Sequence, residues 1–594
     1  MRNYPPMEAS GFAVAIMAAG KGTRLKSKRP KVLHEVGGRA LLLHVIAAAK
    51  TLVPATEIYC IIGHEADRVR AAVEPTGVNF VLQEEQRGTG HAMQVLKASF
   101  ELSGAPVPQH LLVLSGDVPL IQPETLASLR ALHLAEQAAM TILTAVPPDP
   151  TGYGRVLRVA PHSPEVTAIV EQKALTPEQL HAPEINSGIY CFEAAALFAK
   201  LDLLSTENAH GEFYLTDVAA MLVADGKRVV ALQAASVNQV LGANTIAEMM
   251  HLDQAMRAEA ANRLMAQGVT IFRPDTCVID AAVTVGPDTI LEPYVQLLGA
   301  TQIGSDCRIR SHSVIQNSTL ADNVTVRNGC ILDGAQVGAG AILGPYAHLR
   351  PESNIGEQAH VGNFCETKKV TLGRGSKANH LSYLGDAVIG VGVNIGAGVI
   401  TCNYDGVHKH TTTIGDGVFV GSDSTLVAPI RLGDGAYVGA GSCITHPVPA
   451  GALAIGRAHQ STREGWAAKR RARALVTNLI LKDRIEADRH ECEIVQPLVE
   501  DLIQHAKRDS PQAHREALDV LKNPAAVDRL FSVIVPRYAS RKSNFSRILR
   551  LTGAHLDRAR VDLVGTQPEQ GEQTPPRTIA PGPYRFTPPP EKAE

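Results

Sequence analysis

Residues 336–362 read QVGAGAILGPYAHLRPESNIGEQAHVG, and a small aliphatic residue stands at every sixth position of this stretch. A period of six fits neither the alternation of a strand nor the turn of a helix. It predicts short strands joined by corners, with each inward aliphatic side chain stacked on the coil below. The spacing runs through three blocks: Val285, Leu291, Leu297, Ile303, Ile309 and Ile315; Val337, Leu343, Leu349, Ile355 and Val361; and Ile414, Val420, Leu426, Leu432, Val438 and Ile444.

Residues 270–457 are therefore predicted to form a parallel β-helix. Glycine often follows the aliphatic position, as in Val337-Gly338, and suits the corner of a coil. An interior of stacked valine, isoleucine and leucine also explains an aromatic content of only 4%. The segment TCNYDGVHKHTTT, residues 401–413, breaks the phase and is predicted to be a loop displaced from one coil. It could be a neutral insertion or part of a binding face.

Composition excludes several classes of protein. The 594 residues offer room for roughly three to five domains. Lysine and arginine number 57 against 59 aspartates and glutamates, so no global field would hold the chain on nucleic acid or lipid. The hydrophobic content of 45% and the short apolar runs indicate a soluble globular protein without a membrane span. Nine scattered cysteines without a CxxC pair, and no secretory signal, predict reduced thiols and a cytoplasmic location.

The region before the β-helix alternates strands with helices, which predicts a largely parallel sheet covered by helices. A connecting helix is expected over Thr245–Gln267, with Asn244 or Thr245 as its N-cap and Gly268 at its end. The other expected elements are strands at Phe12–Ala18, Glu57–Ile62 and Leu111–Leu114, and helices at Leu41–Lys50, His91–Ser99 and Pro123–Glu136.

The expected domains are residues 1–244, a linker helix at 245–268, the β-helix at 269–466, a helical extension of unknown role at 467–564, and a proline-rich disordered tail at 565–594. The extension carries two basic clusters that could contact an acidic partner or nucleic acid. They are KRRAR at 469–473 and the group Arg537, Arg541, Lys542, Arg547 and Arg550. A solvated helix face is the favoured interpretation, and no nucleic-acid partner is expected.

Three features of the first domain indicate nucleotide chemistry. The turn GKGTR, residues 20–24, follows a strand and is expected to precede a helix, where backbone N–H groups can face a phosphate. Lys21, Arg24 and Lys31 could surround a polyphosphate. Asp117 follows an apolar strand and could hold Mg²⁺, although an Asx turn is the simpler interpretation. The turn QRGTGHA, residues 86–92, could contact a base.

Motif by motif, the chain resembles a known enzyme family. VAIMAAGKGTRLKSKRPKVLH (14–34) resembles the opening of sugar-nucleotide pyrophosphorylases. Together with EEQRGTGHA (84–92), SGDVPL (115–120), DPTGYGRV (149–156), INSGIY (185–190) and the repeats, residues 11–466 are similar to bifunctional N-acetylglucosamine-1-phosphate uridyltransferases and glucosamine-1-phosphate acetyltransferases. The resemblance implies a Rossmann-like nucleotidyltransferase domain with a mixed sheet, then a left-handed parallel β-helix of hexapeptide repeats.

The resemblance also implies roles in uridylyl transfer from UTP to N-acetylglucosamine 1-phosphate with Mg²⁺. Arg24 and Lys31 would serve the reaction itself, with Arg24 facing the departing pyrophosphate. The uridine nucleotide would be held by Ala18, Ala19, Gly20, Lys31, Gln83, Gly88 and Thr89. The sugar would be held by Gly154, Glu171, Asn186 and Asn244, and Mg²⁺ by Asp117 and Asn244.

For acetyl transfer, the resemblance implies that His380 is the general base toward the amine of glucosamine 1-phosphate. Glu366 would orient His380 or the amine. Arg350, Lys368, Tyr383 and Asn394 would bind the sugar phosphate, and Ala397, Asn403, Tyr404, Ser422, Ala440 and Arg457 would line the acetyl-CoA site. The resemblance further implies a homotrimer and a place in cell-wall precursor synthesis.

Three residues depart from the family pattern: Met17 in place of leucine, Ser115 in place of tyrosine or threonine, and Asn379 in place of glycine.

Two rival interpretations of the function stay open at this point. One is a pyrophosphorylase whose β-helix is only structural or regulatory, and the other is a scaffold with a decayed nucleotide domain. His380 with its basic neighbours weighs against the first rival, and Lys31 with Asp117 against the second.

Overall fold

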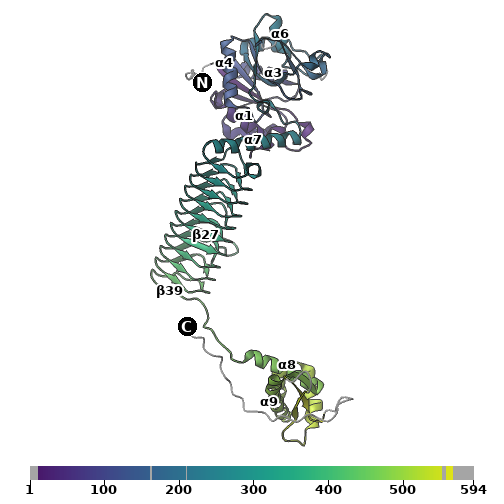
Figure 1. Cartoon of the computed structure of the whole chain (residues 1–594), viewed down its shortest axis with the longest axis vertical. Coiled ribbons are helices and arrows are strands. Elements are labelled where there is room, and N and C mark those ends of the chain that lie inside the picture. The colour runs from purple at the N-terminus through teal and green to yellow at the C-terminus, as the bar shows by residue number, and fades with distance from the viewer. Residues whose placement is uncertain (1–10, 161–162, 209–210, 552–556, 566–594) are drawn as a thin grey trace. The chain divides into compact units, whose positions relative to one another are not determined.

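The structure is a computed structural model that describes residues 11–160, 163–208, 211–551 and 557–565. The chain divides into two compact units, residues 1–457 and 458–594 (Figure 1). Except for Gly565, the tail that the sequence predicts to be disordered lies outside the described residues.

The first unit begins with a mixed sheet. Its strand order is β11-β7-β10-β6-β1-β4-β5, and β10 runs antiparallel to β6 and β7 while the other neighbours are parallel. β8 (Arg155–Arg158) and β9 (Val166–Val170) extend this sheet beside β10. The main strands are β1 (Phe12–Ala18), β4 (Ile58–Ile62), β5 (Asn79–Leu82), β6 (His110–Ser115), β7 (Met140–Ala145), β10 (Ile185–Glu193) and β11 (Val229–Gln233).

Helices cover this sheet, as the sequence predicts, and two separate apolar clusters form the core. The helices are α1 (Leu41–Ala49), α2 (Ala66–Val73), α3 (Thr89–Ser103), α4 (Pro123–Ala135), α5 (Ala194–Leu201) and α6 (Asp217–Ala224). The strands and helices predicted between Phe12 and Glu136 are all present, with ends that differ by a few residues.

The helix predicted directly after GKGTR is absent. Two short 3₁₀ turns, Thr23–Leu25 and Lys31–Leu33, follow the glycine turn instead. Gly22 and Lys26 flank the first turn with φ of 60° and 51°, a left-handed backbone that cannot continue a right-handed helix. Any phosphate contact here therefore comes from loop N–H groups and cationic side chains, without a helix N-terminus.

The connecting helix α7 (Ile246–Ala266) is confirmed. The Thr245 side chain caps it by accepting from the N–H of Glu248. Farther along α7, the Arg257 guanidinium bonds Asp253 of the same helix and the buried Asp280 at the start of the β-helix. Asp253 also accepts the N–H of Gly37, in the turn of the hairpin β2–β3 (Glu35–Val36, Arg39–Ala40). These contacts join the sheet domain and the β-helix in one unit.

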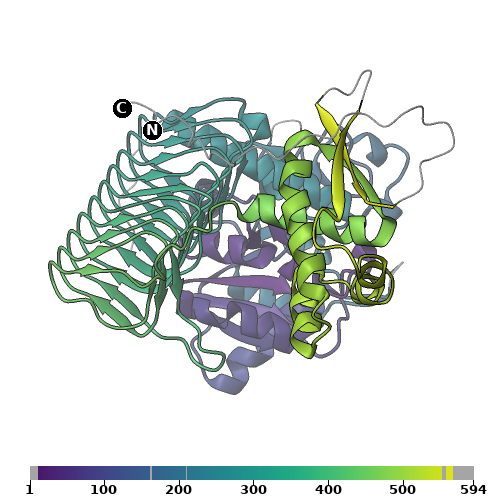
Figure 2. The same cartoon turned by 90° about the horizontal axis from the view of Figure 1, so that it is seen from below.

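The β-helix is built of short parallel strands, β12 (Thr270–Ile271) to β39 (Leu453–Ala454), stacked in one 11-stranded and one 17-stranded sheet (Figure 2). Every aliphatic residue that the six-residue period singles out is buried in one continuous core. The predicted loop is confirmed: β32 (Ile400–Cys402) and β33 (Thr412–Ile414) flank a segment in which Tyr404 pairs with Lys409.

The second unit has its own hydrophobic core. The predicted helices are present, and the structure adds a sheet that the sequence analysis did not anticipate, of order β40-β42-β41 (green and yellow in Figures 1 and 2). The helices are α8 (Trp466–Lys482), α9 (Arg489–Ala506), α10 (Pro511–Leu521), α11 (Pro524–Arg529) and α12 (Val535–Arg537), and the strands β40 (Arg484–Asp488), β41 (Ser546–Arg550) and β42 (Arg558–Leu563). No helix in the described part of the chain is long and apolar enough to cross a bilayer.

Candidate active sites

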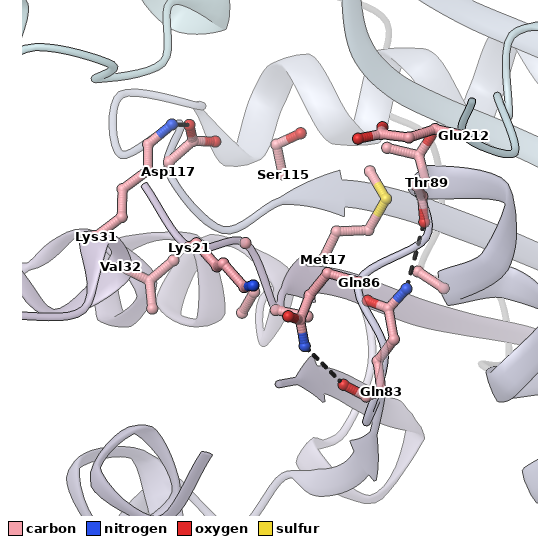
Figure 3. Close-up of a pocket in the computed structure, with 15 residues that line it drawn as sticks. Met17, Lys21, Lys31, Val32, Gln83, Gln86, Thr89, Ser115, Asp117 and Glu212 are labelled. Carbon is pink, nitrogen blue, oxygen red and sulfur yellow. Dashed lines mark hydrogen bonds and ion pairs between the residues drawn. The ribbon is translucent and has the colours of Figure 1, made fainter. Parts of the chain in front are cut away.

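A cavity of about 430 Å³ opens at the carboxyl ends of β1 and β6 (Figure 3). Parallel sheets of this kind bind ligands at that edge. All seven residues assigned to the nucleotide by resemblance line the cavity: Ala18, Ala19, Gly20, Lys31, Gln83, Gly88 and Thr89. Met17 and Ser115, two of the departures from the family pattern, also line it, so both face the same space as these residues.

A group of polar side chains meets at one end of the cavity. The Lys31 ammonium forms an ion pair with Asp117, drawn as a dashed line in Figure 3, and lies 2.9 Å from Oδ1 of Asn244. Arg24 donates to the same Oδ1 at 3.0 Å. One carboxylate and one amide oxygen thus converge on a single cation, although Asn244 is more than a hundred residues from Asp117 in the chain. This oxygen donor set is suited to Mg²⁺ shared with nucleotide phosphates.

The opposite end of the cavity is formed by the turn before α3. Gly88, with φ of 108°, is the N-cap of this helix. The buried Gln83 side chain donates to the carbonyl of Gly88 at 3.3 Å and lies 3.0 Å from Nδ1 of His91. Gln86 donates to the carbonyl of Gln83 at 3.1 Å. These bonds hold the turn in a fixed shape, as recognition of a planar base requires.

The three remaining sugar-site residues also come together. The N–H of Asn186 donates to the carbonyl of Gly154 at 2.9 Å, and the Asn186 amide donates to the hydroxyl of Tyr190. Thr216 donates to Glu171, which lies beside Gly154. Burial raises the pKa of the Tyr190 hydroxyl, so this group stays protonated and keeps its place beside Asn186.

A second polar cluster lies on the β-helix. Strand pairing places Glu366 beside Tyr383 and Asn363 beside His380 on neighbouring coils. The Arg350 guanidinium donates to Glu366 at 2.9 Å. Glu366 is therefore bonded to Arg350, and no bond to His380 is present among the described residues; orientation of the amine by Glu366 stays a prediction. Nδ1 of His380 instead lies 2.9 Å from Oδ1 of Asn363.

Two residues of this cluster escaped the sequence analysis, Asn363 and Lys409. Lys409 comes from the displaced loop, and the nearby ammonium of Lys368 lowers the pKa of Lys409. Two cations held together in this way favour an anion between them. Asn363 precedes His380 by one coil of 17 residues, so counting coils would have found it. No sequence signal pointed to Lys409.

The residues assigned to acetyl-CoA follow one edge of the later coils. Asp423 donates its N–H to the carbonyl of Ala397, and Gly441 donates to that of Ser422. Arg457 donates to the carbonyl of Ala440 at 2.5 Å. Asn403 and Tyr404 begin the displaced loop, where Asn403 donates to Asp386. Asn394 lies in strand β31 (Asn394–Ile395), beside Lys377 of the coil that carries His380.

Family models match segments of both units. In the first unit they are described as "MobA-like NTP transferase domain" over residues 14–177, "Bacterial transferase hexapeptide (six repeats)" over 282–317, and "Hexapeptide repeat of succinyl-transferase" over 411–446. In the second unit, the model "Ribosomal protein L17" matches residues 471–565.

The first unit also has close relatives. The chain is 61% identical to the bifunctional protein GlmU of Koribacter versatilis (strain Ellin345), over 78% of this chain and 97% of that protein. It is 48% identical to GlmU of Solibacter usitatus (strain Ellin6076), over 77% and 97%. Identity of this extent, with the nucleotidyltransferase and hexapeptide domains in the same order, shows that the chain belongs to the bifunctional GlmU family, enzymes with uridyltransferase and acetyltransferase activities.

Proposed function

We propose that the chain makes UDP-N-acetylglucosamine in two steps at two separate sites. The β-helix site acetylates glucosamine 1-phosphate with acetyl-CoA, and the sheet-edge site transfers UMP from UTP to the N-acetylglucosamine 1-phosphate so formed. The observation that carries this proposal is that one unit holds both a polar cavity with Lys31 and Asp117 and a separate cluster around His380. The product would feed peptidoglycan and lipopolysaccharide precursors.

In uridylyl transfer, an oxygen of the sugar 1-phosphate attacks the α-phosphorus of UTP, and the bond to the β-phosphate breaks to release pyrophosphate. The chain's part is to position and to neutralise charge. Lys31 and Arg24 reach the phosphate end of the cavity, while the turn held by Gln83 faces the base. Glu171 and Asn186 would orient the sugar.

Asp117 and Asn244 would hold Mg²⁺. This assignment is supported by the Lys31 ammonium, which bonds both the Asp117 carboxylate and the Asn244 amide oxygen. When bound, Mg²⁺ would neutralise charge on the phosphates. A site with a single carboxylate is weak by itself, so we expect the metal to arrive with UTP.

In acetyl transfer, the amine of glucosamine 1-phosphate attacks the thioester carbonyl. His380 takes the amine proton, the carbon–sulfur bond breaks, and coenzyme A leaves. Arg350, Lys368 and Tyr383 would bind the phosphate with Asn394, and Lys409 would complete this cationic pocket. The residues from Ala397 to Arg457 assigned above would line the acetyl-CoA site.

A homotrimer would complete the acetyl-transfer site. Tyr346, Phe364 and Leu381 form a column at equivalent corners of successive coils, next to His380, and each is more than half exposed. The rings of Tyr346 and Phe364 stack with their centroids 5.6 Å apart. Such an apolar column is suited to burial against a neighbouring β-helix. Light scattering of the purified chain should give three times the mass of one chain.

The two-step proposal has a direct test. The purified chain, given UTP, Mg²⁺, acetyl-CoA and glucosamine 1-phosphate, should form UDP-N-acetylglucosamine. Omission of acetyl-CoA should stop product formation, and N-acetylglucosamine 1-phosphate should restore it. A chain that uses N-acetylglucosamine 1-phosphate but never glucosamine 1-phosphate would support the rival in which the β-helix is only structural. The substrates also favour a cytoplasmic location.

We also propose that the second unit is a ribosomal protein L17-like module. The model named for that protein matches residues 471–565, which include most of α8 and every later described element of the unit. The unit's separate core supports folding as a module. The full chain should sediment with ribosomes, and a chain ending at Arg457 should remain in the supernatant with both enzymatic activities intact.

A further inference from the structure

The first turns of α8 project from the second unit without packing against it (Figure 1). Every residue from 458 to 471 is exposed, and Ala472 is the first buried one. We call residues 463–473, REGWAAKRRAR, the basic arm. Its helix is anchored at one end only, because Val476, Leu479 and Ile480 belong to the core while Trp466 to Arg471 do not.

The charges of the basic arm do not favour its own helix. Four of the five residues 469–473 are basic, and no acidic residue lies in the first turn of α8. Lys469 and Arg473 repel each other at i,i+4, and cations at a helix N-terminus oppose the helix dipole. No acidic side chain in the first turn of the helix offsets these effects, so the pattern favours an external anion.

The rest of the unit neutralises the basic arm only in part, since Lys522 and, with a smaller effect, the nearby Arg473 lower the pKa of the Asp519 carboxyl. Among the described residues, neither Lys469 nor Arg470 forms an ion pair, and Arg471 approaches Glu491 only to 3.9 Å. Some cations elsewhere in the unit do have close acidic partners: Arg529 and Arg537, for example, both bond Asp483.

An aromatic ring accompanies these charges. Trp466 is 52% exposed, and the Arg470 guanidinium lies 5.4 Å from its ring centroid. Trp466, Arg470 and Arg473 follow one stripe of the helix at i, i+4 and i+7. An exposed indole beside guanidinium groups can stack on a base while the cations contact phosphates.

The two units also differ in overall charge. Residues 458–565 hold 20 lysines and arginines against 14 aspartates and glutamates, whereas residues 1–457 hold 34 against 41. The net positive charge of the second unit favours a polyanion, and the basic arm places four of its exposed cations within five residues.

We propose that the basic arm binds RNA, with Lys469, Arg470, Arg471 and Arg473 on backbone phosphates and Trp466 stacked on an unpaired base. The inference rests on the proposed ribosomal role of this unit, and it names the surface that makes the contact. RNA is favoured over an anionic membrane because the arm combines an aromatic platform with cations and because its unit matches a ribosomal protein.

Trp466 is the only tryptophan of the whole chain, so it reports on the arm directly. We expect purified bacterial ribosomal RNA to quench the tryptophan fluorescence of the full chain at concentrations that also give filter binding. Binding should weaken with salt, since phosphate contacts release counterions. Vesicles of phosphatidylglycerol and phosphatidylcholine should leave the fluorescence unchanged.

The test variant replaces Lys469, Arg470, Arg471 and Arg473 with glutamine, which keeps helix propensity. A matched control replaces Lys482, Arg508, Arg515 and Lys522 with glutamine, which removes the same charge from other exposed positions of the unit. The arm variant should bind RNA about tenfold or more weakly, with a shallower salt dependence, because each lost phosphate contact lowers the slope by about one. The control variant should lose much less of its affinity for RNA.

The outcomes separate the two proposals. If the wild-type chain neither sediments with ribosomes nor binds ribosomal RNA, the L17-like role and the arm both fail. If the wild type binds RNA but the arm variant binds as the control does, or tryptophan fluorescence does not respond, only the assignment to the arm is overturned. A fluorescence response to anionic vesicles and not to RNA would also overturn it. Circular dichroism of both variants should match the wild type.

Discussion

Oδ1 of Asn363 accepts a hydrogen bond from Nδ1 of His380, at 2.9 Å, from the coil directly beside it. An amide oxygen can only accept, so in this arrangement Nδ1 carries the proton of the neutral imidazole. The lone pair then resides on Nε2, which is free to take a proton from an amine. Asn363 therefore sets both the tautomer and the orientation of the proposed general base.

Replacement of Asn363 by alanine should lower kcat of acetyl transfer about tenfold to a hundredfold, because a misplaced base loses part of the roughly hundredfold to ten-thousandfold that a positioned general base contributes. KM for glucosamine 1-phosphate should change little, and uridylyl transfer should be unaffected. Asn363→Asp should restore part of the rate and move the acidic limb of the pH–rate profile upward, because a carboxylate stabilises the imidazolium. An Asn363→Asp profile identical to that of Asn363→Ala would count against a positioning role.

The two sites should be separable by single substitutions. Asp117→Ala should lower uridylyl transfer about a hundredfold or more, because it removes the carboxylate bonded to Lys31 at the phosphate end. Acetyl transfer should stay near the wild-type rate. His380→Ala should give the reverse, with acetyl transfer abolished and uridylyl transfer retained. Each variant is thus the control for the other, and parallel loss of both activities in either one would contradict two independent sites.

The fold could be predicted from the sequence because its strongest signals are local and periodic. The six-residue spacing of Leu343, Leu349 and Ile355 identified the β-helix, and each of these residues is buried. Alternating apolar segments identified the sheet domain. The helix expected after GKGTR does not form, because the backbone is left-handed at Gly22 and Lys26 and cannot continue a right-handed helix there.

The site was predicted less completely, because it depends on contacts between distant segments. The family resemblance identified Asp117 and Asn244 as the residues that would hold the metal, and the structure brings both side chains to Lys31. The resemblance did not reveal the bond between Glu366 and Arg350, which depends on how neighbouring coils align. Lys409 is close to Lys368 only because of the path of the displaced loop, which no spacing rule predicts.

The core of the β-helix should be sensitive to the loss of inward methyl groups. Leu343 is fully buried, and the neighbouring Ile342 faces outward and is half-buried. Leu343→Ala should lower the free energy of unfolding by about 2–5 kcal/mol, as cavities in packed cores do. Ile342→Ala, which removes a side chain of the same size, should cost about 1 kcal/mol or less. Urea unfolding followed by far-UV circular dichroism provides the comparison, and equal shifts would contradict the assigned inward face.

Stability of the first unit should fall in mild acid because of the buried His133, which lies against the half-buried His110. Nε2 of His133 lies 3.1 Å from Nδ1 of His110, and Nδ1 of His133 lies 2.9 Å from the Thr141 hydroxyl. Burial, with a smaller contribution from His110, lowers the pKa of His133 to about 4. Burial also lowers the pKa of His110, which Glu193 and Arg130 affect with opposite signs.

In the unfolded chain, His133 titrates near pH 6.5, so between pH 6.5 and about 4 the unfolded state binds more protons than the folded state. Stability is therefore full above pH 6.5 and declines as the pH falls, by about 3 kcal/mol from this group. Replacement by glutamine, which cannot be protonated, should flatten the fall of the melting temperature between about pH 7 and about pH 4. His446→Gln, at an exposed position of the β-helix, is the matched control and should keep the wild-type slope. A His133→Gln slope equal to that of the wild type would show that other groups govern acid unfolding.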